Sequence, residues 1–325
     1  MFCLFAPLKI PHFATLRSVT TCSTTRSSTR CSMAGRVLAA SLLLFTIAPH
    51  RPAQAWNAVG HMTIAAIAEP RLSARAKREI EALLPLVADP RTPTFLTAGV
   101  WMDDIRADGV RLFDRWHYDN LGHSPDGTPL GPRHTDNVAW AVETNVRALQ
   151  NEKVSLPEKA RALRFLMHTA QDAHNPLHCG SRFTKDDPTG DSGGNGFRLG
   201  DGTGNGAGNE AGQGPRNLHA LWDGALGTFG RTNGGGNETR LESEVRLRAL
   251  AVTLAVKYPE ASLSQSAVLD PQKWVEEGSA LLKDGVYPLT ASPNATYFER
   301  FRPVAERQAT LAGYRLARLL NTIWP

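Results

Sequence analysis

Residues 156–178 read LPEKARALRFLMHTAQDAHNPLH, and this stretch indicates both the kind of fold and the place of its site. Apolar side chains recur at helical spacing through residues 156–173. Ser155 and Glu158 have the spacing of a capping box, which marks the start of a helix. The stretch therefore predicts a long helix with one buried face.

The end of the same stretch concentrates ligand side chains. His168 and Asp172 are four residues apart, so on a helix they point the same way. Asn175-Pro176 should end the helix, and the turn that follows returns His178 to the same neighbourhood. Imidazole and carboxylate side chains suit zinc, which indicates a metal site at this helix end.

The rest of the chain has the same helical character. Residues 71–87, 137–150 and 296–324 also space apolar residues as helices do, and Pro303 is expected to break or kink the last of these. No segment alternates as a strand does, so the predicted fold class is all-α. The Gly-rich residues 189–214 are expected to form a long loop or insertion without a phosphate-binding pattern.

Net charge gives no indication of a partner. The 325-residue chain carries a formal charge of +5, but residues 1–55 contain six Lys or Arg and no acidic residue. Without them, 30 basic residues face 31 acidic ones, a net charge near −1. Bulk charge of the remaining chain therefore favours no class of partner.

The first 55 residues look like a targeting segment. Met33 is followed by an arginine, an apolar run too short for a comfortable membrane span, and Ala53-Gln54-Ala55, a small-x-small cleavage pattern. We expect a signal peptide at 33–55, with Met33 as the true initiator, and the alternative for 1–32 is a long or organellar targeting segment. The mature domain would then span 56–325, secreted or periplasmic, without stable membrane association.

Cysteine usage agrees with this boundary. Cys3, Cys22 and Cys31 lie upstream of it, and Cys179 alone remains in residues 56–325. An intramolecular disulfide is then impossible in the mature protein. Its stability must come from its core or from bound metal.

Further ligand side chains lie in short motifs spread along the chain. His219 and Asp223 repeat the i, i+4 spacing of His168 and Asp172. The other motifs are WNAVGH (56–61), WMDDIR (101–106) and RWHYDN (115–120). Residues 56–325 contain eight histidines, and five of them lie at candidate ligand positions in these motifs or in the opening stretch, which randomly placed surface histidines would seldom do. They are His61, His117, His168, His178 and His219.

Together these motifs resemble the single-strand-specific zinc-dependent nucleases and 3′-nucleotidases of the S-one/P-one type. The markers are an N-terminal Trp followed by GH, then W-x-D-x-x-R, W-H-Y, H-x-x-x-D-x-H-x-P-L-H, GGN and NLH-x-x-WD, in that order. The resemblance implies a single, mostly α-helical domain, the architecture of phospholipase C and nuclease P-one, built around three zinc ions.

The resemblance also implies which residues hold each ion. One zinc would be bound by Asp103, His117, His168 and Asp172. A second would be bound by His61, Asp172 and the free amine and carbonyl of Trp56, so that Asp172 bridges two ions. The third would be bound by His178, His219 and Asp223. Of the remaining candidates, His123 is expected not to be a ligand, His174 either orients a ligand or packs against the helix, and Asp104 is a solvated neighbour.

The implied chemistry is phosphodiester hydrolysis. Paired zinc ions would activate water near neutral pH, and the third ion would neutralise the leaving 3′-oxygen. Arg106 and Asp103 are the predicted catalytic residues, with Arg106 stabilising charge on the phosphoryl oxygens. The expected activity is hydrolysis of single-stranded DNA or RNA to 5′-mononucleotides, with 3′-nucleotidase activity, by a monomer.

Substrate-binding residues are expected next to His117. Tyr118 is the candidate for stacking on a base, and its alternative role is a core aromatic. The family has a base-binding carboxylate where this chain has Asn120, which leaves base preference open, and Asp119 has no settled role.

Two other functions stay open. Zinc-dependent phospholipase C shares the architecture and the N-terminal Trp, although GGN and NLH-x-x-WD favour the nuclease. An exported zinc-binding or structural protein is the non-enzyme alternative, and Arg106 beside a full ligand set argues against it.

Overall fold

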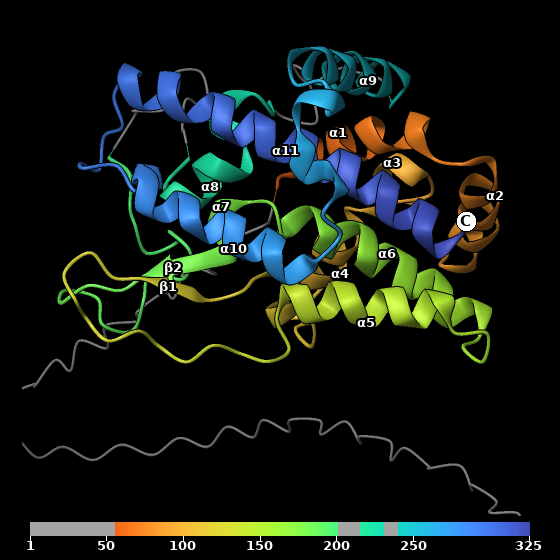
Figure 1. The fold of residues 1–325 in the computed structure, drawn as a ribbon, viewed down its shortest axis with the longest axis horizontal. Helices are drawn as coiled ribbons and strands as arrows, with labels where there is room; N and C mark the ends of the chain where they lie inside the picture. The colour runs from red at the N-terminus through yellow and green to blue at the C-terminus, as the bar shows by residue number, and fades with distance from the viewer. Residues whose placement is uncertain (1–55, 201–214, 231–239) are drawn as a thin grey trace, which may run out of the picture. The chain divides into compact units, whose positions relative to one another are not determined.

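The computed structural model describes residues 56–200, 215–230 and 240–325, and within them the chain is built from helices (Figure 1). This confirms the predicted all-α class. The helices are α1 (Ala58–Ala68), α2 (Ala74–Leu83), α3 (Phe95–Ala98), α4 (Trp101–Ala107), α5 (Val138–Gln150), α6 (Leu156–Asp172), α7 (Pro176–Cys179), α8 (Leu218–Asp223), α9 (Arg240–Lys257), α10 (Pro271–Leu281) and α11 (Ala295–Ile323).

Helix α6 forms as its sequence predicts. Ser155 and Glu158 make the expected capping box, with the Ser155 backbone N–H donating to Glu158 Oε2 at 3.2 Å. From Ala162 to Asp172 every residue is buried, because α6 lies between α5 on one side and α1, α4 and α11 on others. Burial of the whole final turn places His168 and Asp172 in the interior.

The end of α6 differs slightly from the prediction. The helix ends at Asp172, three residues before Asn175-Pro176, with Ala173 as its C-cap. Pro176 then begins the single turn α7, whose N-cap is Asn175. A helical turn therefore brings His178 back toward His168 and Asp172. Proline is well suited to the first turn of a helix, so Pro176 can begin α7.

The C-terminal helix corrects one expectation. Helix α11 runs unbroken through Pro303, which was expected to break or kink it. Pro303 is exposed, and so is Glu299, whose carbonyl loses its helical partner there. Water can satisfy that carbonyl on the solvent side, so the helix continues.

The second predicted helix is shorter than expected. Instead of 71–87, α2 covers Ala74–Leu83, with Ser73 accepting a hydrogen bond from Ala76 N at its start. Short 3₁₀ turns with a proline in their first turn, Glu69–Arg71 and Leu84–Leu86, flank it. Leu84 keeps helical dihedrals, but Pro85 has no backbone N–H to donate to the carbonyl of Glu81, which limits α2.

Two strands that the sequence analysis did not predict connect the segments around the site. β1 (Leu121–His123) and β2 (Gly180–Arg182) pair in parallel, with Leu121 opposite Gly180. Three residues are too few for alternation to be visible in a sequence. The pair joins the segment after His117 to the segment after His178, and it thereby aligns two parts of the site.

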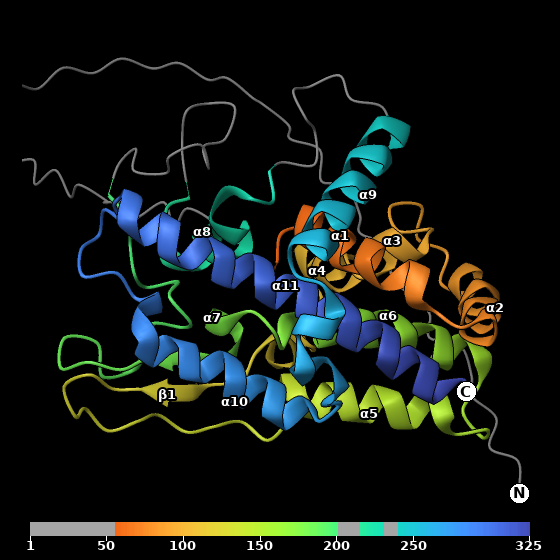
Figure 2. The same ribbon diagram turned by 45° about the horizontal axis from the view of Figure 1, so that its top comes forward.

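Helices α1 and α11 pack side by side in the core (Figure 2). Nine of the eleven residues of α1 are buried. The packing is close, since a Cβ at Gly313 would lie 2.6 Å from Cγ2 of Ile67. This contact holds the end of α1 against α11, and the same helix carries His61 near its start.

Several predictions concern residues outside the described ranges. The predicted signal peptide at 33–55, the segment 1–32 and residues 201–214 of the Gly-rich insertion lie there. Residues 189–200 of the insertion form turns and one isolated bridge, Arg198 to Asn217, but no helix. None of the described helices combines the length and the apolar character that crossing a membrane requires.

Candidate metal centre

All nine residues predicted to bind metal are buried in the helical core. Each is at most 5% exposed. They come from the start of the described chain and from six elements, α1, α4, the 3₁₀ turn Asp114–His117, α6, α7 and α8. They are Trp56, His61, Asp103, His117, His168, Asp172, His178, His219 and Asp223.

The histidines and carboxylates gather into three groups whose ligand atoms lie within 4.8 Å of one another. These groups are His61, Asp103 and His168; His117, His168 and Asp172; and His178, His219 and Asp223. Any of the three could hold a metal ion.

The carboxylate of Asp172 faces two of these groups at once. Its Oδ1 lies 3.6 Å from His61 Nε2, while its Oδ2 lies 3.0 Å from His168 Nε2 and 3.3 Å from His117 Nδ1. Each oxygen therefore points to a different set of imidazole nitrogens. This is the geometry that a carboxylate bridging two cations requires.

Several atoms of the first two groups have no hydrogen-bond partner among the described residues. They are His61 Nε2, both carboxylate oxygens of Asp103, His117 Nε2 and Asp172 Oδ1. Unpaired polar atoms are costly to bury. Cations bound in these groups would satisfy them, so the residues present fit metal ions.

The third group carries the clearest indication of a cation. His178 Nδ1 donates to the carbonyl of His117 at 2.6 Å, and His219 Nδ1 donates to the carbonyl of Gly193 at 2.7 Å. In neutral rings both Nε2 atoms then carry lone pairs, yet they lie 3.0 Å apart. Burial, and then the neighbouring His219, lower the pKa of His178 and keep that ring neutral.

A carboxylate completes this third group. Asp223 Oδ2 lies 3.6 Å from His219 Nε2, and Asp223 Oδ1 lies 3.9 Å from His178 Nε2. Asn175 Nδ2 donates to the same Oδ1 at 3.0 Å and fixes its orientation. Two facing lone pairs beside an anion repel one another unless a positive charge lies between them.

Burial also shifts the acids toward protonation. It raises the pKa of Asp172 to about 7 and that of Asp103 to about 6. For His168, burial alone would lower the pKa, but Asp172 and Asp103 raise it to about 9. Without metal, protons would occupy part of this cluster, and metal binding would have to displace them.

A cavity of about 300 Å³ opens beside the cluster. Its wall includes Arg106, Tyr118 and Asn120, the three residues predicted to contact substrate, together with His134 and Asn195. Arg106 Nε donates to Asp114 Oδ1 at 2.9 Å, which holds the guanidinium at this wall. Tyr118 is half-buried in the cavity lining, so it is not the core aromatic of the alternative prediction.

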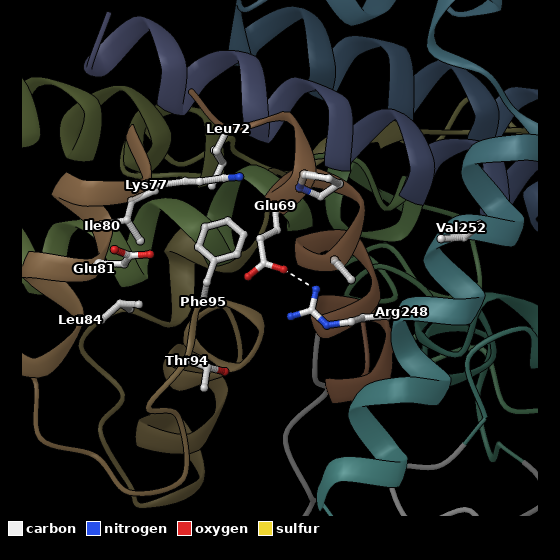
Figure 3. Close-up of a pocket in the computed structure, with 12 residues that line it drawn as sticks. Glu69, Leu72, Lys77, Ile80, Glu81, Leu84, Thr94, Phe95, Arg248 and Val252 are labelled. Atoms are coloured by element: carbon white, nitrogen blue, oxygen red, sulfur yellow. Dashed lines mark hydrogen bonds and ion pairs between the residues drawn. The ribbon is translucent and has the colours of Figure 1, made fainter. Parts of the chain in front are cut away.

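A wider cavity lies away from the cluster. It has a volume of about 660 Å³ and opens between α1, α2 and α9 (Figure 3). Its lining is mainly apolar, with an ion pair between Glu69 and Arg248 across it, and contains no histidine. Size alone would select this cavity, but the ligand chemistry lies at the smaller one.

The structure distinguishes the remaining histidines from the cluster. His174 Nδ1 donates to the carbonyl of Ala170 at 2.8 Å, and Arg315 Nη1 donates to its Nε2 at 3.1 Å. Its ring packs on Trp274, so of the two expected roles it takes the packing one. His123 lies on β1, where it stacks on Tyr287.

The acidic residues near the predicted ligands also have partners of their own. Asp119 is buried and accepts two hydrogen bonds from the guanidinium of Arg133. Asp104 is half-buried, 3.8 Å from Arg91, rather than fully solvated. Neither belongs to the three ligand groups.

Sequence reasoning missed the groups that orient the rings. These are the carbonyls of Gly99, His117 and Gly193 and the side chain of Gln171. Gly193 belongs to the motif GGN (193–195), but the sequence did not indicate that its carbonyl orients His219. No local pattern could reveal the others, because each acceptor is distant in sequence from the ring that it holds.

A helical domain that buries three histidine–carboxylate groups beside an open cavity has the ligand groups that a metal-dependent hydrolase needs. Comparison with known proteins agrees. The S1/P1 Nuclease family matches residues 56–325. The chain is also 24% identical to Nuclease S1 of Aspergillus oryzae (strain ATCC 42149 / RIB 40) over 292 residues, 82% of this chain and 91% of that protein. The chain belongs to the S1/P1 nuclease family, which confirms the predicted resemblance and makes nucleic acid the expected class of substrate.

Proposed function

We propose that the mature chain is a zinc-dependent phosphodiesterase that hydrolyses single-stranded DNA and RNA to 5′-mononucleotides, with accompanying 3′-nucleotidase activity. The observation that carries the metal dependence is the pair of facing Nε2 atoms of His178 and His219, 3.0 Å apart beside Asp223. The family match supplies the class of reaction.

The proposal assigns three zinc ions to the nine buried residues. His178, His219 and Asp223 hold one ion, and Asp103, His117, His168 and Asp172 hold another. His61, Asp172 and the amine and carbonyl of Trp56 hold the third. A mixed set of imidazole and carboxylate ligands is the donor set that zinc accepts. Bound there, zinc would supply Lewis acidity and an activated water near neutral pH.

The protein's own residues position the phosphodiester. Arg106, fixed by Asp114, directs positive charge into the cavity that the cluster adjoins. In a site shielded from water, such a charge stabilises the extra negative charge of the transition state more strongly than it does the substrate. The carbonyls of Gly99, His117 and Gly193 keep three ligand rings in the tautomer that presents Nε2.

The size and lining of the cavity support the proposed preference for single strands. A volume of about 300 Å³ accommodates one nucleoside rather than a base pair. Tyr118 would stack on that base, and the amide of Asn120, whose Oδ1 has no partner within the described part of the chain, would contact its edge. A base in a duplex would first have to leave its stack.

Export and processing are part of the proposal. Cleavage after Ala55 would release Trp56 as the first residue of a secreted or periplasmic monomer. Trp56 is completely buried, and its indole Nε1 donates to the carbonyl of Gln171 at 3.0 Å, which attaches this residue to the end of α6 that carries Asp172.

The test is an assay of the purified mature protein on single-stranded DNA, duplex DNA, 3′-nucleotides and phosphatidylcholine, together with elemental analysis. We expect close to three zinc ions per chain and faster cleavage of single strands, with 5′-phosphorylated products. Release of 3′-phosphorylated products would contradict the proposed leaving group. Activity on phosphatidylcholine alone would favour a phospholipase C.

A further inference from the structure

Gln171 is a buried residue beside the cluster, and the proposed function gives it no role. Gln171 precedes Asp172 on the last turn of α6 and is completely buried. Its Oε1 lies 2.7 Å from His61 Nδ1. Its main-chain carbonyl accepts a hydrogen bond from Trp56 Nε1 at 3.0 Å. One residue therefore contacts both His61 and Trp56.

We infer that Gln171 is the positioning residue for the zinc ion assigned to Trp56 and His61, and that it sets the affinity of this one ion. The inference rests on the proposed zinc cluster and adds a residue to it. Gln171 does not touch the ion or the substrate. It acts through the His61 ring, whose Nε2 faces Asp172 Oδ1 at 3.6 Å.

The hydrogen bond decides which ring nitrogen is presented to the metal. When Oε1 accepts from His61, Nδ1 must carry the proton, and Nε2 keeps its lone pair. His168, His178 and His219 are held in the same tautomer, but by main-chain carbonyls. His61 is the member of these four that depends on a side chain, so its orientation can be changed by mutation.

The surroundings hold Gln171 in this position. A Cβ on Gly99 would lie 3.0 Å from Gln171 Nε2, so the glycine leaves just enough room for the amide. On its other side, the His61 ring stacks on His168 with centroids 4.3 Å apart. Gln171 Nε2 has no hydrogen-bond partner in the described residues, so the bond to His61 is the side chain's polar contact.

The experiment compares three variants. Q171M keeps the length of the side chain and removes the hydrogen-bond acceptor. Q171E replaces the amide with a carboxylate, which can accept the hydrogen bond from His61 but cannot donate one. The matched control is Q308M, because Gln308 is also buried and its Nε2 donates to the carbonyl of His174 at 3.4 Å, away from the three ligand groups. Each protein is loaded with zinc and titrated with a chromogenic zinc chelator, and unfolding of the zinc-free forms is measured in parallel.

We expect Q171M to bind one of three zinc ions about 10- to 100-fold more weakly than the parent, with the other two unchanged. Q171E should retain three ions at parental affinity or tighter. Q308M should lose stability without losing zinc affinity. Unchanged affinity for all three ions in Q171M, or an equal loss in Q308M, would overturn the positioning role.

The readout separates this inference from the nuclease assignment. A parent that binds three zinc ions but cleaves no phosphodiester would contradict the proposed function, while selective loss of one ion in Q171M would still support the role of Gln171. Conversely, an active nuclease whose zinc affinities do not respond to Q171M would retain the function and lose this inference.

Discussion

Single residues in this protein orient the predicted metal ligands mostly through main-chain atoms. The carbonyls of Gly99, His117 and Gly193 each accept from a ring nitrogen at 2.6 to 2.7 Å. Replacing a residue's side chain does not remove its main-chain carbonyl. Mutational tests at the residue scale must therefore use the side chains around the cavity.

Arg106 is the side chain whose removal should separate catalysis from metal binding. R106M should lower kcat about 10²- to 10³-fold, because a charge aimed at the phosphoryl group is lost, while the zinc content stays at the parental value. Steady-state cleavage of single-stranded DNA and elemental analysis check this. R115M is the control, since Arg115 is exposed and pairs with Asp136 outside the cavity. An active R106M would remove the arginine from the mechanism.

At the scale of elements, the turn at Gly193, which follows β2, shapes the third ligand group. Gly193 has φ +62°, and a Cβ there would lie 2.2 Å from the carbonyl oxygen of Leu177. G193A should therefore displace the carbonyl that holds His219, with lower zinc content and a lower unfolding temperature. G127A is the control, because Gly127 has φ +79° but nothing within 4 Å. It should cost only about 1–2 kcal/mol, and an equally mild G193A would contradict the role of the turn.

Glu306 joins three segments of the chain. On α11, it accepts hydrogen bonds from Thr228 Oγ1, Lys257 Nζ and Tyr258 OH at 2.8, 2.6 and 3.0 Å. Burial alone would raise its pKa, but the bonds from Lys257, Thr228 and Tyr258 bring the pKa below the ordinary 4.5. This carboxylate therefore stabilises the fold above pH 4.5, and the contribution is lost as pH falls through its lower folded pKa.

E306Q should accordingly lower the free energy of unfolding by about 1–3 kcal/mol at pH 7. The difference from the parent should shrink once the pH falls below the folded pKa, where the parental carboxyl is protonated too. Urea denaturation at several pH values measures this. E299Q, a change at an exposed position of the same helix, should have little effect at any pH. A pH-independent loss in E306Q would mean that its charge is not involved.

The elements also show what a sequence can reveal. Helix α6 was predictable because its cap and its apolar spacing are local, and the i, i+4 ligand pairs followed from helical geometry. The strands β1 and β2 were not, because three-residue strands leave no period. Gln171 was not either, since its function depends on His61, 110 residues away.

For the whole molecule, the position of Trp56 connects processing with metal content. In the proposed cluster its α-amine is a ligand, and an amide nitrogen in an uncleaved chain is a very poor one. A form extended by a few residues before Trp56 should therefore bind one zinc ion less and show lower activity than the form that starts at Trp56. Elemental analysis and the single-strand assay compare them. Equal zinc content and equal activity would exclude the amine from the centre.

The hydrogen bonds between ligand rings and carbonyls join residues far apart in sequence, and this has a consequence for the order of folding events. Gly99 and His168 are 69 residues apart, and His117 and His178 are 61 apart. An unfolded chain offers only the i, i+4 pairs, so a complete ligand set exists only after the helices have assembled. Zinc should therefore leave the refolding rate unchanged and slow unfolding instead. Stopped-flow refolding of the chemically denatured mature chain with and without zinc measures both, and faster refolding in zinc would show that the ion helps to nucleate the fold.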